Sequence, residues 1–260
     1  MDKLPKAYFL SHNGLGDNIT SISAINYLSQ YYNIIYFLCK DIYVNNVKLL
    51  YENNKSIVII PFNHNDEFNE CKKILNDALN KDKDINIFVS GCHKSYINSI
   101  ITHPQLITYK KQNKNYTIDY PFIENFYKDI NLDLSIYYEY FYIESSNISK
   151  KYYEDIKKYK IIFLHLKSST NEINLSYIIN KYINNDSYLI ICANKNVYTE
   201  DNLKYNIANK FVNLPIQYYI DIILNCEEIY VIDSCFSCIV FPLNKTNKLK
   251  AKKVKIIKRS

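Results

Sequence analysis

The segment SHNGLGDNITSISAINYL, residues 11–28, decides the fold because it places a glycine-rich turn between a predicted strand and a predicted helix. Gly14 and Gly16 are two of only 3 glycines in the 260-residue chain, and Asp17 follows directly. Glycine permits positive φ and lets a ligand approach backbone N–H groups, so this turn is expected to admit one. Apolar residues then recur every three positions from Ile19, which predicts a helix over 18–31. Such a strand, turn and helix form the first βα unit of a parallel sheet, whose ligands bind at the carboxyl edge.

The rest of the chain repeats this alternation, which predicts an α/β fold with parallel sheets flanked by helices. The expected strands are 7–11, 33–38, 56–60, 85–90, 160–166, 187–192, 210–213, 228–233 and 253–258. The expected helices are 18–31, 41–53, 67–81, 94–102, 121–130, 148–158, 172–184, 199–208, 216–226 and 235–243. The alternation of strands and helices is interrupted at a tyrosine-rich stretch, IYYEYFYIES, which is predicted to be extended. This break predicts two Rossmann-like domains, 1–150 and 151–260, that face each other across a cleft.

Charge and cysteine content narrow the possible functions. The formal net charge is +6, but residues 245–259 contribute +8 without any acid, so the remainder sums to −2. A nucleic-acid-binding body would spread Lys and Arg over one face, so we exclude that partner. The basic tail is expected to be solvated or to make a weak contact with an anionic membrane.

We find no membrane-spanning run or signal peptide, which predicts a cytoplasmic protein, and the 7 cysteines are expected to be reduced.

Asp17 is the informative residue of the first turn. A carboxylate at a helix N-terminus would repel phosphate, but the helix dipole keeps it ionised, so it can act as a base toward a neutral hydroxyl. Alternatively, Asp17 only caps the helix over 18–31. The dinucleotide fingerprint G-x-G-x-x-G is a further alternative, with Asp41 as the ribose-binding acid, although Ile19 occupies the third glycine position.

A family resemblance begins in this turn. The motif H-N-G-L-G-D-N-I-x-x-x-x-A-I-x-Y-L resembles the N-terminal motif of the ADP-heptose:lipopolysaccharide heptosyltransferases, glycosyltransferase family 9. The matching positions are Gly14, Gly16, Asp17, Ala24, Ile25 and Leu28. The resemblance implies the GT-B fold, with the acceptor on the N-terminal domain and the nucleotide sugar on the C-terminal domain. It also implies that Asp17 is the catalytic base.

Two segments of the C-terminal half resemble the same family. EEIYVIDSCFSCIVFPL resembles its strand followed by Asp-Ser/Thr-Gly-x-x-His, which assigns Asp233 and Ser234 to donor binding. Cys235 and Cys238 replace the usual Gly and His of that segment. LHLKSSTNE resembles the loop that opens the family's C-terminal domain, where basic or hydroxyl side chains meet the diphosphate. The corresponding candidates are Lys167, Ser168 and Ser169.

The remaining candidates stand at predicted strand ends. His12 and His165 each end the first strand of their half. His12 is expected to orient the acceptor or assist Asp17, and His165 to contact phosphate, unless both are hydrogen-bonded strand-end histidines. Other residues assigned to the acceptor side by position are Asn13, in the first turn, and Gly91 and His93, in the loop after the fourth strand.

The sequence therefore predicts a glycosyltransferase that moves a sugar from a nucleotide-diphosphate donor to a hydroxyl of a glycan, lipid-linked or protein acceptor. The resemblance implies inversion at the anomeric carbon. Fixed positive groups near the diphosphate, and no carboxylate pair placed like a DxD metal site, predict neither a metal nor another cofactor. The alternatives are a non-catalytic nucleotide-sugar-binding protein, favoured by Cys235 and Cys238, and an NAD-dependent oxidoreductase. The spacing Cys235-x-x-Cys238 also admits a thioredoxin-like reading, which its place late in the chain disfavours. It admits a zinc-binding reading too, which the lack of a second such pair at a suitable spacing disfavours.

Overall fold

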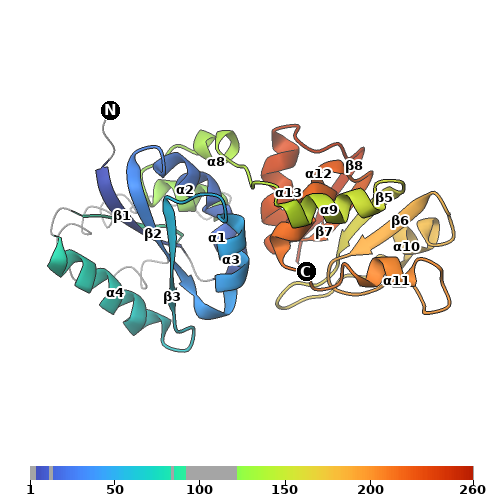
Figure 1. Ribbon diagram of the computed structural model, residues 1–260, viewed down its shortest axis with the longest axis horizontal. Coiled ribbons are helices and arrows are strands. Elements are labelled where there is room, and N and C mark those ends of the chain that lie inside the picture. The colour runs from blue at the N-terminus through green and yellow to red at the C-terminus, as the bar shows by residue number, and fades with distance from the viewer. Residues whose placement is uncertain (1–3, 12–13, 83–84, 92–121, 260) are drawn as a thin grey trace. The chain divides into compact units, whose positions relative to one another are not determined.

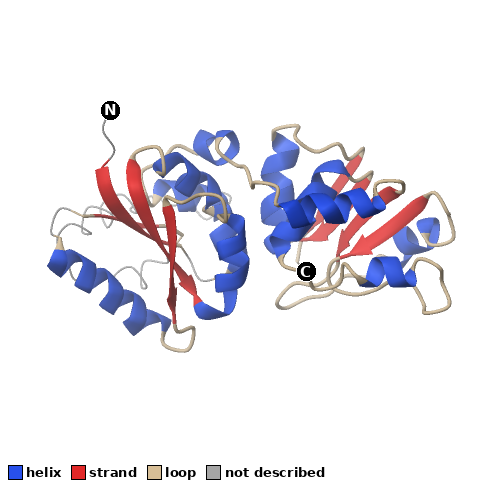
Figure 2. Cartoon of the chain, viewed as in Figure 1, coloured by secondary structure: helices blue, strands red, loops and turns tan. Residues whose placement is uncertain are grey.

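The computed structural model describes residues 4–11, 14–82, 85–91 and 122–259 and divides into two compact units, Met1–Tyr142 and Ile143–Ser260 (Figure 1). Among the described residues, each unit contains one four-stranded parallel sheet with helices packed beside it (Figure 2). The predicted α/β class, with parallel sheets flanked by helices, is confirmed.

The sheet of the first unit has the strand order β3-β2-β1-β4. Its strands are β1 (Leu4–Leu10), β2 (Tyr32–Lys40), β3 (Ile57–Phe62) and β4 (Asn86–Val89). Its helices are α1 (Leu15–Thr20), α2 (Ile22–Leu28), the 3-10 turn η1 (Asp41–Tyr43), α3 (Val44–Leu50), α4 (Glu67–Lys81), α7 (Phe122–Lys128) and α8 (Ser135–Glu139). In the register of the sheet, Phe9 lies opposite Phe37 and Phe88. The strands are continuous apolar runs because both faces of a parallel sheet are covered.

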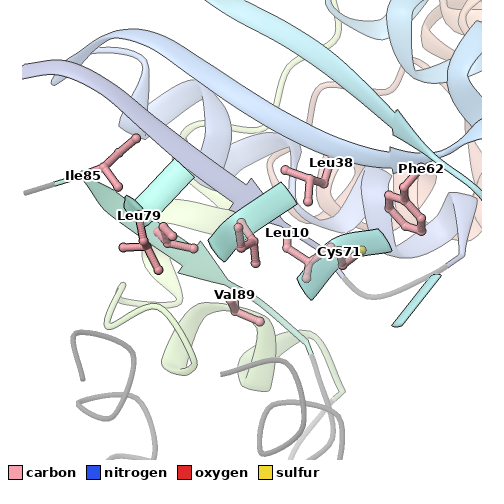
Figure 3. Close-up of a cluster of buried hydrophobic side chains, with 9 residues drawn as sticks. Leu10, Leu38, Phe62, Cys71, Leu79, Ile85 and Val89 are labelled. Atoms are coloured by element: carbon pink, nitrogen blue, oxygen red, sulfur yellow. The ribbon is translucent and has the colours of Figure 1, made fainter. Parts of the chain in front are cut away.

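One face of this sheet packs against the apolar stripe of α4 (Figure 3). The buried cluster joins three residues of α4 to the strands and to the residue before β4, and consists of Leu10, Leu38, Phe62, Cys71, Leu75, Leu79, Ile85, Ile87 and Val89. On the opposite face, the rings of Phe9 and Phe37 meet edge to face, and Tyr51 packs on Phe37 in the same way. Each fully buried side chain of this kind stabilises the fold by about 1.5–3 kcal/mol, so the sheet forms a rigid support for the loops at its edges.

The sheet of the second unit has the order β6-β5-β7-β8. Its strands are β5 (Lys160–His165), β6 (Tyr188–Cys192), β7 (Glu228–Ile232) and β8 (Lys253–Ile257). Its helices are α9 (Asn147–Ile156), α10 (Ser176–Tyr182), α11 (Tyr205–Asn209), the 3-10 turn η4 (Ile216–Tyr219), α12 (Ile220–Asn225) and α13 (Cys235–Lys245). The rings of Phe163, Tyr219 and Phe236 contact one another on one face and join β5, η4 and α13.

Several sequence predictions are wrong in detail, among them the helix predicted over 199–208, of which only α11 (Tyr205–Asn209) forms. Residues 210–213 form no strand, because Asn213 adopts φ 56° and its N–H bonds to the carbonyl of Ala193 at 2.8 Å. The tyrosine-rich stretch begins inside helix α8 instead of being extended throughout, because Tyr137 is fully buried against Tyr127 and Phe141. The helix predicted over 18–31 begins at Leu15 and is interrupted at Ser21. The helix predicted over 94–102 lies outside the described residues.

Two features concern the ends of the second unit. Helix α9 belongs to it, because Ser146 donates to Gln217 Oε1 at 2.9 Å and Asp221 N–H donates to Ser149 Oγ at 3.0 Å. The basic tail is not simply a solvated end, because β8 pairs with β7 along its length. Lys253 and Lys255 alternate there with Val254 and Ile256, the usual pattern of an edge strand that resists further pairing.

Candidate functional site

The strand order reverses once in each sheet, between β1 and β4 in the first unit and between β5 and β7 in the second. Connections leave the two strands of such a switch point in opposite directions, and parallel α/β sheets bind their ligands there, at the carboxyl ends. The turn after β1 and the loop after β4 meet this condition in the first unit. The loop after β5 and the turn after β7 meet it in the second. The described site residues predicted from the sequence lie in these four connections or at the strand ends beside them, except Gly16 and Asp17, which lie in the first turn of α1.

Asp17 is the third residue of α1, and its side chain folds back on the turn. Gly14 N–H donates to Asp17 Oδ2 at 2.7 Å, and the buried side chain of Asn18 donates from Nδ2 to the Gly14 carbonyl at 2.7 Å. Asp17 as a residue is half-buried. Asp17 therefore caps a helix, which was the alternative to a role as a base. It does so as a residue of the first turn of α1, at the switch point of the sheet. Because it lies at the start of a helix, the dipole favours its ionised form.

The glycines of this turn act differently from the expectation. Gly14 has φ −94°, so it does not need the left-handed region, and Gly16 lies inside α1. A Cβ added at Gly14 would stand 2.9 Å from Asp17 Oδ2, which is closer than real Cβ atoms approach other atoms. A Cβ at position 14 would therefore compete with the carboxylate of Asp17 for the same space, and that carboxylate would have to move.

Hydroxyl side chains hold the helix that carries Asp17. Ser21 Oγ donates to the Asp17 carbonyl at 3.1 Å and lies 2.9 Å from Ser11 Oγ at the end of β1. Tyr127 of α7 donates to the Thr20 carbonyl at 2.9 Å. These bonds link α1 to the end of β1 and to α7. The bond from Ser21 Oγ to a carbonyl four residues back explains the interruption between α1 and α2.

The loop after β4 is shaped by its packing on α7. Gly91 adopts φ +71°, and a Cβ there would meet ring atoms of Phe126 at 2.5–2.8 Å. Its N–H donates to Asp129 Oδ2 at 2.8 Å, and Ser90 Oγ donates to the Phe126 carbonyl at 2.7 Å. Here the positive φ expected of a functional glycine is present, and the contacts show a structural reason for it. Asp129 is a buried carboxylate that sequence reasoning missed, because only the fold brings it to residue 91.

Three predicted acceptor-side residues, His12, Asn13 and His93, lie outside the described residues.

His165 and Ser234 meet at the switch point of the second unit. His165 Nδ1 lies 3.0 Å from Ser234 Oγ, and the imidazole packs on Phe236 with ring centroids 4.6 Å apart. Burial lowers the pKa of His165 from 6.5 to about 4. His165 is therefore neutral near pH 7 and acts as a hydrogen-bonding partner of Ser234, not as a cation for phosphate.

The turn after β7 is closed by its own side chains. Ser234 N–H donates to Ser237 Oγ at 2.9 Å, and Ser237 Oγ lies 2.9 Å from Asp233 Oδ1. Arg259, just beyond β8, donates from Nε to the Asp233 carbonyl at 2.5 Å. Sequence reasoning missed Ser237 and Arg259. The spacing Ser234-x-x-Ser237, a hydroxyl at the helix start and another three residues later, was a usable signal for the first.

The loop after β5 is a tight turn built on Ser168. Ser168 N–H and Oγ both contact the Asn171 carbonyl, at 2.7 and 3.1 Å, and Asn171 N–H donates to Ser168 Oγ at 2.9 Å. Ser168 is buried, whereas Lys167 and Ser169 are exposed. The hydroxyl of Ser168 thus shapes the loop, and Lys167 and Ser169 are the side chains that the loop presents to solvent.

A pH titration tests the environment of His165. The unfolded chain takes up a proton on this ring below about pH 6.5, whereas the folded unit does so only near pH 4. The contribution of His165 to the free energy of unfolding should therefore fall by about 3 kcal/mol as the pH drops from about 6.5 to about 4, and this contribution should change no further below that pH. Imidazole NMR, assigned with a His165→Asn variant, should show one ring titrating near pH 4. A His165 ring that titrates near pH 6.5 would contradict this.

The oxidoreductase and redox alternatives find little support. Asp41, the ribose-binding candidate, accepts hydrogen bonds from Ile42 N–H at 2.8 Å and from His64, whose Nδ1 lies 2.7 Å away. Burial raises the pKa of the Cys235 thiol to about 11, whereas thioredoxin-like thiols are reactive because their pKa is lowered.

Within the described ranges, no group of three or more His, Cys, Asp or Glu residues is placed to hold a metal ion. No helix of the described chain combines the length and apolar character needed to span a membrane.

Comparison with known proteins finds likeness in structure alone, since neither family models nor curated sequences match the chain. The E. coli ADP-heptose LPS heptosyltransferase II superposes with TM-score 0.58 at 12% identity, covering 98% of this chain and 90% of that one. A glycosyl transferase family 9 protein from Veillonella parvula superposes with TM-score 0.59 at 9% identity, covering 100% and 88%. The E. coli heptosyltransferase WaaC with ADP gives TM-score 0.52 at 8% identity, covering 98% and 91%. The resemblance to heptosyltransferases is thus confirmed at the level of the fold, along almost the whole length of each chain.

Proposed function

We propose that this protein is a glycosyltransferase that moves a sugar from a nucleotide-diphosphate donor to an acceptor hydroxyl. One observation carries the proposal: a fold like that of the heptosyltransferases places the Asp17 carboxylate at the switch point of its first unit. A carboxylate is a group that can act as a general base, and the switch point at the carboxyl edge is where such sheets bind ligands.

In the proposed reaction Asp17 is the general base. Its carboxylate takes the proton from the acceptor hydroxyl while the oxygen attacks the anomeric carbon of the sugar. The bond from that carbon to the diphosphate breaks, and the nucleoside diphosphate leaves with the electron pair, so the configuration inverts. The hydrogen bond from Gly14 N–H to Oδ2 orients the group without exhausting it, because a carboxylate offers about four lone pairs.

The donor is assigned to the carboxyl edge of the second unit. Lys167 supplies an exposed cation and Ser169 an exposed hydroxyl. Ser234 has its hydroxyl fixed by neutral His165, and Asp233 is held by Ser237. These contacts favour a rigid edge at which backbone N–H groups and Lys167 stabilise the charge that develops on the diphosphate. We propose that no metal ion or other cofactor takes part. A cytoplasmic location, and a weak contact of the Lys-rich tail, residues 245–259, with anionic membranes, stay predictions.

A ligand panel tests the function directly. Thermal unfolding is measured with UDP-, GDP-, ADP-, CMP- and dTDP-linked sugars, and any stabilising donor is then assayed for slow hydrolysis with and without EDTA. A donor present at 100 times its Kd should stabilise the fold by about 2.7 kcal/mol. Hydrolysis that persists in EDTA is expected. Binding without any turnover would instead favour a non-catalytic nucleotide-sugar-binding protein, and stabilisation by NAD(H) alone would revive the oxidoreductase.

A further inference from the structure

Arg259 is the only arginine among the 32 basic residues of the chain. Its guanidinium Nε donates to the Asp233 carbonyl at 2.5 Å, in the turn between β7 and α13. An anchored Nε fixes the plane of a guanidinium, and the two Nη groups then point away as a fork of four N–H donors.

The fold brings this side chain to the candidate donor edge. Ile257, the last residue of β8, lies opposite Ile232 at the end of β7, and Asp233 N–H donates to the Ile257 carbonyl at 2.8 Å. Arg259 follows two residues later and therefore lies at the carboxyl edge of the sheet, beside the start of α13. The approach of Arg259 also shows at Cys235, where its charge partly opposes the rise in pKa caused by burial.

The charge of Arg259 is not compensated within the described part of the chain. No carboxylate of those residues lies within ion-pair distance of the guanidinium, whereas Lys252 pairs with Glu227 at 2.7 Å and Lys195 with Glu172 at 2.6 Å. Asp233 contacts Arg259 through its backbone carbonyl, and its side-chain Oδ1 accepts a hydrogen bond from Ser237 Oγ at 2.9 Å.

We propose that Arg259 is a donor-binding residue whose Nη groups bind the diphosphate of the nucleotide at the β7–β8 side of the second unit. This assignment rests on the proposed function, because it takes a nucleoside diphosphate as the ligand. An arginine suits the role better than the surrounding lysines because its planar fork matches two phosphate oxygens at once. The exposed side chain, held at Nε alone among its described contacts, is placed to do so without a rearrangement of the sheet.

The test is isothermal titration of the full chain with ADP, UDP, GDP, CDP and inorganic pyrophosphate. For whichever of these the parent binds, Arg259→Ala should raise Kd about 10- to 100-fold, because charge-assisted bidentate bonds are lost. Arg259→Lys keeps the charge but loses the fork, and should raise Kd about tenfold. The matched control is Lys255→Ala, which removes an equal charge from an exposed position within β8 and should change Kd less than about twofold.

The outcomes separate this inference from the proposed function. If the parent binds a nucleoside diphosphate and Arg259→Ala binds it within about twofold as well, Arg259 is not a ligand and the proposed function is untouched. Equal weakening by Lys255→Ala would show a general charge effect and also overturn the assignment. If pyrophosphate or a nucleoside diphosphate binds through Arg259 but no sugar is transferred, the binding site stands and the transferase proposal fails. A parent chain that binds none of the probes would overturn both.

Discussion

Asp17→Asn is expected to lower the rate of sugar transfer at least about 100-fold while leaving the affinity for the donor unchanged. Asparagine has the shape of aspartate, and its side-chain carbonyl can still accept the Gly14 N–H that now bonds to Oδ2 at 2.7 Å. The turn should therefore persist, and only the ability to take up a proton should be lost. Initial rates with the donor identified by the ligand panel, together with donor titrations, separate turnover from binding.

Gly14→Ala provides the companion test of the same carboxylate. A Cβ at this position would stand 2.9 Å from Oδ2 and should push the Asp17 side chain out of its hydrogen bond. Turnover should fall although the carboxylate is still present, since its position is lost. A fully active Asp17→Asn variant would remove Asp17 from the mechanism and leave it as the cap of α1.

Gly91→Ala should be the most destabilising single substitution discussed for the first unit, with a cost of about 2–5 kcal/mol. Two effects add. The backbone has φ +71°, where a Cβ costs about 1–2 kcal/mol. The new Cβ would also enter the Phe126 ring, 2.5 Å from its nearest atom, and overpacking of that kind costs about 1–3 kcal/mol. Urea denaturation followed by circular dichroism measures the change in the free energy of unfolding.

Two further variants separate the cost of the positive φ from the cost of the clash with Phe126. Gly14→Ala is the matched control, because position 14 has φ −94° and its Cβ meets only a carboxylate that can rotate, so its cost should stay near 1 kcal/mol. Phe126→Leu combined with Gly91→Ala should cost less than the sum of the single changes, because the smaller side chain relieves the clash. A Gly91→Ala variant within about 0.5 kcal/mol of the parent would show that the loop after β4 yields easily.

The sequence predicted most of the secondary structure because each element carries its own periodic pattern. Helix α4 begins at Glu67 and ends at Lys81, as predicted, because its apolar stripe and flanking polar residues coincide. The sequence predicts the start of the helix after the first turn three residues too late, because Leu15 and Gly16 show no helical pattern of their own. The segment 210–213 looked like a strand because Phe211 and Val212 are apolar, yet the ring of Phe211 packs on Tyr152 outside any sheet.

What the sequence determined by itself is which residues stand at strand ends, because an apolar run stops where the chain leaves the sheet. His165, at the end of β5, follows from this rule alone, whereas Asp17 and Ser234 follow from the turns after their strands and from the family resemblance. Only the tertiary structure decided which strand ends are neighbours, since the order of strands in a sheet depends on packing between segments far apart in the chain. The contacts of Gly91 with Phe126 and Asp129, and of Arg259 with Asp233, arise from that order. No local period encodes them, because each joins residues on different elements.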